Sequence, residues 1–233
     1  MDVHKPKPWH GLREFLKEYL IIVIGVLTAL GAEQVVEDLH WRHAVQAQRE
    51  ALDGEIAHRL TVASTRLIQE SCIQSRLKEL RIVFERHKAG TPMGLKGPVG
   101  TPTVLNGGQG VWATSAGSQA MEHMSAEERQ RFGHAFQAYA IMDANLAAEV
   151  DTWSELGSLD DAAILEMGDW PALRAAYVRA SYWDMRNRFY ADWVLKNDAA
   201  GQKPLPFDLG YLIRLKEPVR NLCRPMLARR SPK

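Results

Sequence analysis

The amino-acid sequence predicts an all-α protein in which an N-terminal transmembrane helix continues into a long helix, followed by a helical bundle. Three observations support this fold class. An uncharged apolar run, YLIIVIGVLTALGA, extends from Tyr19 to Ala32. Farther along the chain, apolar residues recur at spacings of three, four and seven, which is typical of amphipathic helices. No segment of useful length shows the alternation that would indicate a β-strand.

Composition narrows the class of protein. The 233 residues can hold one domain of ordinary size plus an anchor. Hydrophobic residues make up 46% and charged residues 24%, which is typical of a globular chain and not of a disordered or polytopic one. A formal net charge of +1 gives no reason to expect nucleic acid as a partner.

The apolar run is the candidate anchor. Its 14 residues span about 21 Å as a helix, less than the roughly 30 Å hydrocarbon core. Apolar neighbours from Phe15 to Val36 extend the helix to about 33 Å. We therefore expect residues 19–36 to cross the membrane and residues 1–18 to lie in the cytoplasm. Two alternatives stay open at this stage, a buried core helix of a soluble protein and a cleaved signal peptide.

Basic residues near the run predict its orientation. Those before it are Lys5, Lys7, Arg13 and Lys17, whereas Arg42 alone follows closely after it. The positive-inside rule then places the N-terminus in the cytoplasm and the C-terminal domain outside. In a bacterium the span would lie in the inner membrane and the domain in the periplasm. Gly25 and Ala29 are four residues apart, a spacing of small residues that permits helices to associate in membranes.

Residues 37–88 continue the helical pattern. Apolar residues recur from Val35 to Leu67, and charged residues, among them Glu55 and Arg59, fill the other positions. Gly54 is a weak interruption, because glycine costs about 1 kcal/mol relative to alanine inside a helix. So long a pattern indicates either a coiled-coil stalk, which could associate with a second copy, or the first long helix of a bundle.

Residues 89–110 form the clearest loop, with seven glycines and three prolines between Gly90 and Gly110. We expect residues 111–233 to form a helical domain that packs against the long helix. The first predicted helix of this domain starts at a Ser125–Glu128 capping box and ends near Gly157, and Asp160–Met167 forms a short helix at most. A second helix runs from Asp169–Trp170–Pro171, with aspartate as the cap, to Lys196. Gly201, Pro204 and Pro206 then break the chain, and a last helix covers Asp208–Leu227, which Pro218 could interrupt.

No catalytic, cofactor or metal motif stands out. His40 and His43 could share one helix face toward a metal ion, but no third ligand is identifiable. His123 and His134 fit polar surface residues. The stretch Gly107–Gly110 lacks the lysine and serine of a phosphate loop. We therefore assign no catalytic residue, no metal ligand and no cofactor.

The segment from Trp170 to Trp193 is rich in aromatic side chains. It holds seven of them, with four arginines interleaved. Such a pattern is more often core packing, with arginines stacked over aromatic rims, than a surface for a partner. We therefore expect these aromatics to belong mainly to the core. Glu33, just after the apolar run, fits a solvated position at the membrane interface.

The two cysteines, Cys72 and Cys223, form no CxxC pair, so zinc and redox motifs of short spacing are absent. One lies on the first long helix and the other on the last. If both face an oxidising compartment, a disulfide between them would persist there. We predict that disulfide; the alternative is two buried free thiols, which behave as small hydrophobic groups.

The segment REFLKEYLIIVIGVLTALGAEQVVEDLHWRHAVQ resembles the start of a family of uncharacterised bacterial proteins with an N-terminal membrane anchor and a helical remainder outside the cytoplasm. The resemblance lies in Ile24–Leu30, which matches an I-G-V/I-L-x-A-L core, and in the polar Glu33–Gln34 that follows. It implies an anchored helical protein. It implies no activity and no catalytic residue.

Three hypotheses for function remain. The first is a non-enzymatic anchored protein that binds an unidentified protein partner or supports an envelope assembly, with membrane lipid around its span. The second is an enzyme whose site is built only by tertiary proximity, and the third is a sensory input domain that works through a partner. A pocket that gathers titratable side chains would favour an enzyme, whereas a broad exposed apolar patch would favour partner binding.

Overall fold

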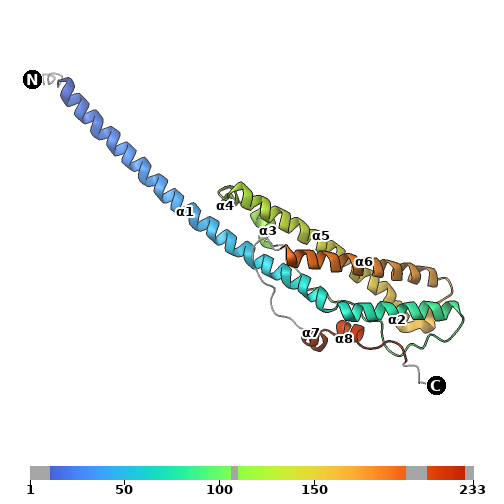
Figure 1. Ribbon diagram of the computed structural model, residues 1–233. Coiled ribbons are helices and arrows are strands. Elements are labelled where there is room, and N and C mark those ends of the chain that lie inside the picture. Colours follow the sequence, from blue (N-terminus) through green and yellow to red (C-terminus); the bar gives the residue numbers. More distant parts are fainter. Residues whose placement is uncertain (1–10, 106–109, 198–208, 229–233) are drawn as a thin grey trace, which may run out of the picture.

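The computed structural model describes residues 11–105, 110–197 and 209–228, and every regular element within them is helical. Four long helices dominate: α1 (Leu12–Ile68), α2 (Glu70–Lys88), α5 (Ala126–Leu156) and α6 (Trp170–Lys196). The short elements are α3 (Gly110–Ser115), α4 (Gln119–Glu122), the 3-10 helix η1 (Gly157–Ile164), α7 (Leu209–Leu215) and α8 (Glu217–Cys223). Figure 1 shows α1 as a rod whose second half enters the bundle. The predicted fold class is confirmed.

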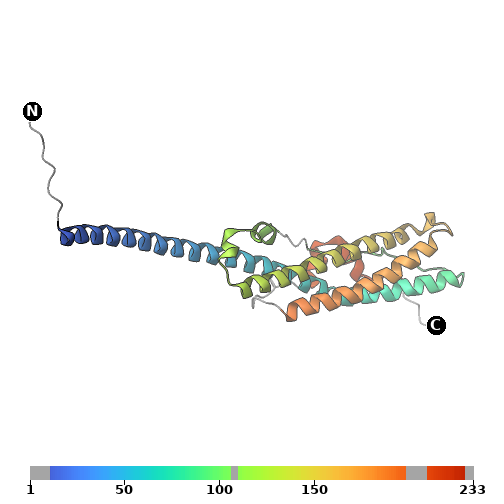
Figure 2. The same ribbon diagram turned by 90° about the horizontal axis from the view of Figure 1, so that it is seen from above.

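No described part of the chain packs against the first half of α1. Its most apolar 18-residue window has a mean hydropathy of 2.0, and none of that window is buried. Large side chains such as Ile21, Ile22 and Leu27 are more than 60% exposed. Seen from above, this half projects well beyond the other helices (Figure 2). Among the described residues α1 is the one helix long and apolar enough to cross a membrane.

From Val45 onward α1 packs into the bundle. Leu52, Ile56, Leu60 and Ala63 are fully or almost fully buried, so the predicted apolar stripe is used within the chain. Of the two alternatives for residues 37–88, these contacts support the bundle helix and give no support to a coiled-coil stalk. The helix passes through Gly54 without a break.

The helical hydrogen-bond pattern changes at Gln69, so the predicted long helix is two consecutive helices, α1 and α2, with a change of direction between them (Figure 1). The backbone of Gln69 stays in the right-handed helical region. Its buried side-chain amide donates to the carbonyls of Thr65 (2.8 Å) and Thr103 (3.0 Å), and its oxygen accepts from the Thr103 N–H (2.9 Å). The loop after α2 is thereby fastened to the α1–α2 junction.

The bundle has two hydrophobic cores at different positions along its long axis. The core nearer the exposed half of α1 is formed by α1, α4, α5 and α6, and includes Leu52, Ile56, Phe132 and Met142. The distal core is formed by α2, α8, the end of α5 and the start of α6, and includes Leu80 and Trp153. Because Leu173 of α6 belongs to the distal core and Val194 to the other, α6 runs back toward the exposed half of α1.

The helix boundaries of α5 and α6 follow the sequence, with one correction. Both hydrogen bonds of the Ser125–Glu128 capping box are present, and α5 ends at Leu156. Arg49 of α1 donates two hydrogen bonds to the Glu128 carboxylate, and this bidentate ion pair lowers the pKa of Glu128. Asp169 does not cap α6, contrary to the prediction: its carboxylate accepts from the Glu166 N–H (2.8 Å) and closes the preceding turn.

The C-terminal helix predicted over residues 208–227, which Pro218 could interrupt, is two short helices that end earlier, at Cys223. The chain forms α7 and α8, which are separated at Lys216, and then an extended segment that reaches Ala228. We call residues 221–228, which comprise the end of α8 and this extended segment, the C-terminal strap. Pro218 explains the break, because its ring lacks an N–H and clashes with the preceding turn of a continuous helix. The predicted breaks at Gly201, Pro204 and Pro206 lie outside the described residues.

The strap is bound on one side by the loop after α2 and on the other side by α2 itself. In the loop after α2, the Lys96 N–H donates to the Met226 carbonyl (2.8 Å), and the Ala228 N–H donates to the Gly94 carbonyl (3.0 Å). Gly100, with φ of +65°, lies so close that a Cβ there would be 2.3 Å from the Leu222 nitrogen. Only glycine suits this combination of conformation and contact.

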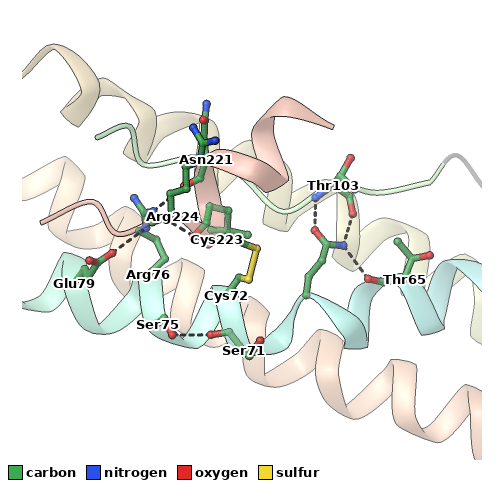
Figure 3. Close-up of a disulfide and its surroundings, with 12 residues drawn as sticks. Thr65, Ser71, Cys72, Ser75, Arg76, Glu79, Thr103, Asn221, Cys223 and Arg224 are labelled. Carbon is green, nitrogen blue, oxygen red and sulfur yellow. Dashed lines mark hydrogen bonds and ion pairs between the residues drawn. A yellow bond between two sulfur atoms is a disulfide. The ribbon is translucent and has the colours of Figure 1, made fainter. Parts of the chain in front are cut away.

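On the other side, one face of α2 holds the strap through three residues (Figure 3). Cys72 forms a disulfide with Cys223, their Cα atoms 4.7 Å apart. One turn on, fully buried Arg76 donates to the carbonyls of Asn221, Leu222 and Arg224. Glu79 accepts from the N–H groups of Met226 and Leu227. The pairing inferred from the two cysteines is the one present in the structure.

Replacing both cysteines with serine, Cys72→Ser with Cys223→Ser, should lower the free energy of unfolding by up to about 5 kcal/mol. The disulfide joins residues 151 apart, and cross-linking so long a loop restricts the unfolded chain. The midpoint of chemical denaturation, compared with the unreduced wild type, measures the change. Two titratable thiols in the denatured, unreduced wild type would contradict the bond itself.

Candidate functional site

A layer of polar side chains separates the two cores. The layer contains seven buried polar residues: Thr65, Arg66 and Gln69 near the α1–α2 junction, Glu149 and Thr152 on α5, and Asp184 and Asn187 on α6. Sequence periodicity gave no hint of the layer, because its members occupy positions where a core helix normally carries apolar residues. Glu55 and Arg59 of α1, which lie outside the apolar stripe in the sequence pattern, are also buried.

Arg66 is the centre of the layer. Its guanidinium, 1% exposed, donates two hydrogen bonds of 2.9 Å to Glu149 and one of 2.9 Å to Asp184. It also reaches Glu70, one turn along, at 3.0 Å. Asn187 donates to Glu149 at 2.8 Å. One cation therefore ties α1 to both α5 and α6.

Burial sets the electrostatics of this cluster. Desolvation, with help from nearby Glu70 and Glu149, raises the pKa of Asp184 to about 6, although Arg66 opposes the shift. Burial also disfavours the charged form of Arg66, but Glu149 and Asp184 outweigh it and raise the pKa of the guanidinium. A shifted carboxyl can indicate an active site. Asp184, however, is only 2% exposed in the described part of the chain and faces the other polar side chains of the layer.

The surface offers a different candidate on α6. Five large side chains form a continuous exposed row: Val178 (61% exposed), Tyr182 (44%), Met185 (54%), Phe189 (63%) and Trp193 (41%). We call this row the α6 stripe. Its spacing of four, three, four and four residues keeps all five on one helix face. The described residues of the chain leave all five exposed.

This result corrects the expectation that the aromatic segment is mainly core. Trp170 is buried, but Tyr182, Phe189 and Trp193 are not. The sequence contained the relevant signal, since the helix has a second apolar face in addition to the one that carries Leu173, Ala176, Ala180 and Ala191. Only the arrangement of neighbouring helices decides which face is covered.

A shallow apolar hollow continues the stripe toward the distal end of the bundle. It has a volume of about 700 Å³ and is lined by residues that include Met167, Trp170, Pro171 and Val178. The His87 ring stacks on Trp170 with centroids 3.5 Å apart and closes one side. The hollow's lining includes Arg174 and Arg179 but no carboxylate.

Arginines line both edges of the α6 stripe. Helical geometry places Arg174 and Arg188 along one edge and Arg179 and Arg186 along the other. Arg188 lies 3.3 Å from Glu70, and Arg179 pairs with Glu155. Arg186 contacts Asn145 and the rings of Tyr182 and Tyr190. Carboxylates of neighbouring helices pair with two of these arginines, so the excess positive charge at the edges of the stripe comes from Arg174 and Arg186.

The remaining sequence candidates form no site. His40, His43 and His134 are exposed, and the described residues contain no group of three metal-ligating side chains. His123 stacks on Trp41 with centroids 4.0 Å apart, near the point where α1 leaves the bundle. Glu33 is exposed. Of the stretch Gly107–Gly110, only Gly110 is described, as the first residue of α3.

Comparison with known proteins adds no relative. No protein-family model, no curated protein and no solved structure matches this chain.

Replacing Arg66 should reveal how strongly the polar layer depends on it. Arg66→Met leaves Glu149 and Asp184 buried without their cation, which should cost about 3–5 kcal/mol of stability. Adding Glu149→Leu and Asp184→Leu removes those charges and should recover most of the loss. Chemical denaturation measures all three proteins.

The matched control is Arg81→Met, which breaks an exposed pair with Glu85 on α2. Exposed pairs of this kind contribute little, so its denaturation midpoint should stay close to that of the wild type. Equal losses of unfolding free energy for Arg66→Met and Arg81→Met would show that the buried cluster contributes no more to stability than an exposed ion pair does.

Proposed function

We propose that this chain is a non-enzymatic, single-span membrane protein whose helical bundle binds a partner protein outside the cytoplasm. The observation that carries the proposal is the α6 stripe, a row of five exposed apolar side chains on a well-packed bundle. Contiguous apolar patches of this kind are uncommon on soluble surfaces and usually mark interaction sites.

The buried groups favour binding over catalysis. Asp184, whose pKa burial raises to about 6, lies inside the polar layer and accepts a hydrogen bond from Arg66. Catalysis would need such groups to converge on a cleft that a substrate can enter. The hollow beside the α6 stripe is lined by apolar side chains, His87 and two arginines, and it has no carboxylate.

The first half of α1 suits a span that carries the bundle just clear of the lipid. From Val36, at the expected end of the span, to Val45, the first buried residue, the helix rises about 13 Å. That distance exceeds the headgroup layer on one side of a bilayer, which is roughly 5–8 Å thick. Trp41 then lies at the level of the headgroups, where tryptophan is enriched.

Two independent observations support the proposed orientation. Basic residues cluster before the span, and such residues stay in the cytoplasm. The Cys72–Cys223 disulfide on the other side suits an oxidising compartment, which in a bacterium is the periplasm.

Site-specific photo-crosslinking in native membranes tests the proposed function. A photoreactive amino acid is placed at Met185 on α6, Lys78 on α2 or Gln137 on α5, three exposed positions on different helices. A binding module should give a discrete protein adduct from at least one helix, with no adduct from the others. The absence of any adduct at all three positions would contradict partner binding.

A further inference from the structure

We propose that the α6 stripe and its distal hollow bind an amphipathic helix of another protein, one whose apolar face is bordered by aspartate or glutamate. This inference deepens the proposed function and rests on it. It follows from the shape of the stripe, from the charges along its edges, and from the exclusion of two other occupants.

The shape suits a helix. From Val178 to Trp193 the stripe extends about 23 Å along α6, the length of about four helical turns. Its spacing of four, three, four and four residues is the pattern by which helices pack side by side. The hollow beside Val178 continues the apolar surface past Pro171 to Met167. An apolar side chain near one end of a docked helix would fill it.

The charges select an acidic partner. Arg174 and Arg186 have no carboxylate partner among the residues that the structure describes, and Arg179 and Arg188 are about half exposed. The carboxylates on α6 itself are Asp184, which is buried, and Asp192, which pairs with Lys196. A helix with acidic edges would meet arginine on both sides of its apolar face.

A second copy of this chain fits poorly. Two copies anchored in one membrane would stand parallel, so that their α6 helices would pair in the same direction. When two helices pair in parallel, an edge residue of one helix lies close to the edge residue five positions later in the other helix. Arg174 of one copy would therefore lie close to Arg179 of the other copy. Like charges at facing edge positions disfavour the pair and reject the wrong partner.

A lipid surface fits poorly as well. Because α6 runs back toward the exposed half of α1, the α6 stripe leads away from the span (Figure 1). Trp193, at the end nearer the membrane, can approach lipid, whereas Val178 lies about 23 Å farther along α6. An amphipathic helix that binds a bilayer must lie in its plane.

Two synthetic peptides test the proposal on the full chain in lipid nanodiscs. Both are 21-residue helices with the same leucine and isoleucine face, bordered in one by glutamate and in the other by lysine. Fluorescence anisotropy of the labelled peptides measures the dissociation constants. The glutamate peptide should bind at least tenfold more tightly than the lysine peptide, and its affinity should fall with added salt. Equal affinities, or no binding of the glutamate peptide, would overturn the proposal.

Variants then locate the site. Phe189→Ser should weaken binding of the glutamate peptide at least tenfold, because the side chain is 63% exposed on the α6 stripe. Arg174→Gln with Arg186→Gln should reduce the preference for glutamate over lysine. The matched control, Ile82→Ser, removes an exposed apolar side chain from α2 and should leave affinity unchanged. Circular dichroism melting verifies that each variant is folded.

The remaining outcomes separate this inference from the proposed function. If the wild type is a dimer and Phe189→Ser makes it a monomer, a second copy occupies the stripe and the inference is wrong. If crosslinks form from Lys78 or Gln137 and the glutamate peptide does not bind, partner binding stands and the acidic helix is wrong.

Discussion

The buried ion pairs of Arg66 constrain how the helices of the bundle can be aligned. Arg66 lies at the height where the two hydrophobic cores meet, and its bonds to Glu149 and Asp184 hold α1, α5 and α6 in a single register. Sliding any of these helices by one turn would leave a charge buried without a partner, a cost of several kilocalories per mole. Apolar packing alone tolerates such shifts better, because many apolar contacts are interchangeable. The polar layer therefore specifies the arrangement, and the cores above and below it supply most of the stability.

The contacts of α6 with Arg66 and Glu149 also decide which face of α6 is exposed on the surface of the bundle. Because Asp184 and Asn187 must face Arg66 and Glu149, the opposite face of α6 must point away from the bundle. That face carries Tyr182, Met185 and Phe189. The same long helix that contributes Arg66 extends into the exposed apolar segment, so the stripe keeps a constant orientation relative to the span. At the far end, Cys72, Arg76 and Glu79 fasten the C-terminal strap to α2 and close the distal core.

Much of this architecture could be predicted from local patterns. The capping box at Ser125, the glycine- and proline-rich loop and the proline at the start of α6 are decided by neighbouring residues, so sequence reasoning finds them. Asp169 shows the limit: it has the right residue type for a cap, but its carboxylate bonds to Glu166. Arg59 and Arg66 show a deeper limit, because their partners lie more than 80 residues away along the chain. The α6 stripe could not be predicted for the same reason, since a helix with two apolar faces does not reveal which one its neighbours cover.

The central claim is that the exposed half of α1 spans a membrane and holds the bundle outside the cytoplasm. The most direct measurement uses two reporters fused in turn after Lys233, one active only outside the cytoplasm and one that becomes fluorescent only inside it. The account predicts activity from the first reporter and no fluorescence from the second, with both fusion proteins in the membrane fraction after a high-salt wash. Fluorescence from the second reporter, or release of the fusion proteins by salt, would contradict it.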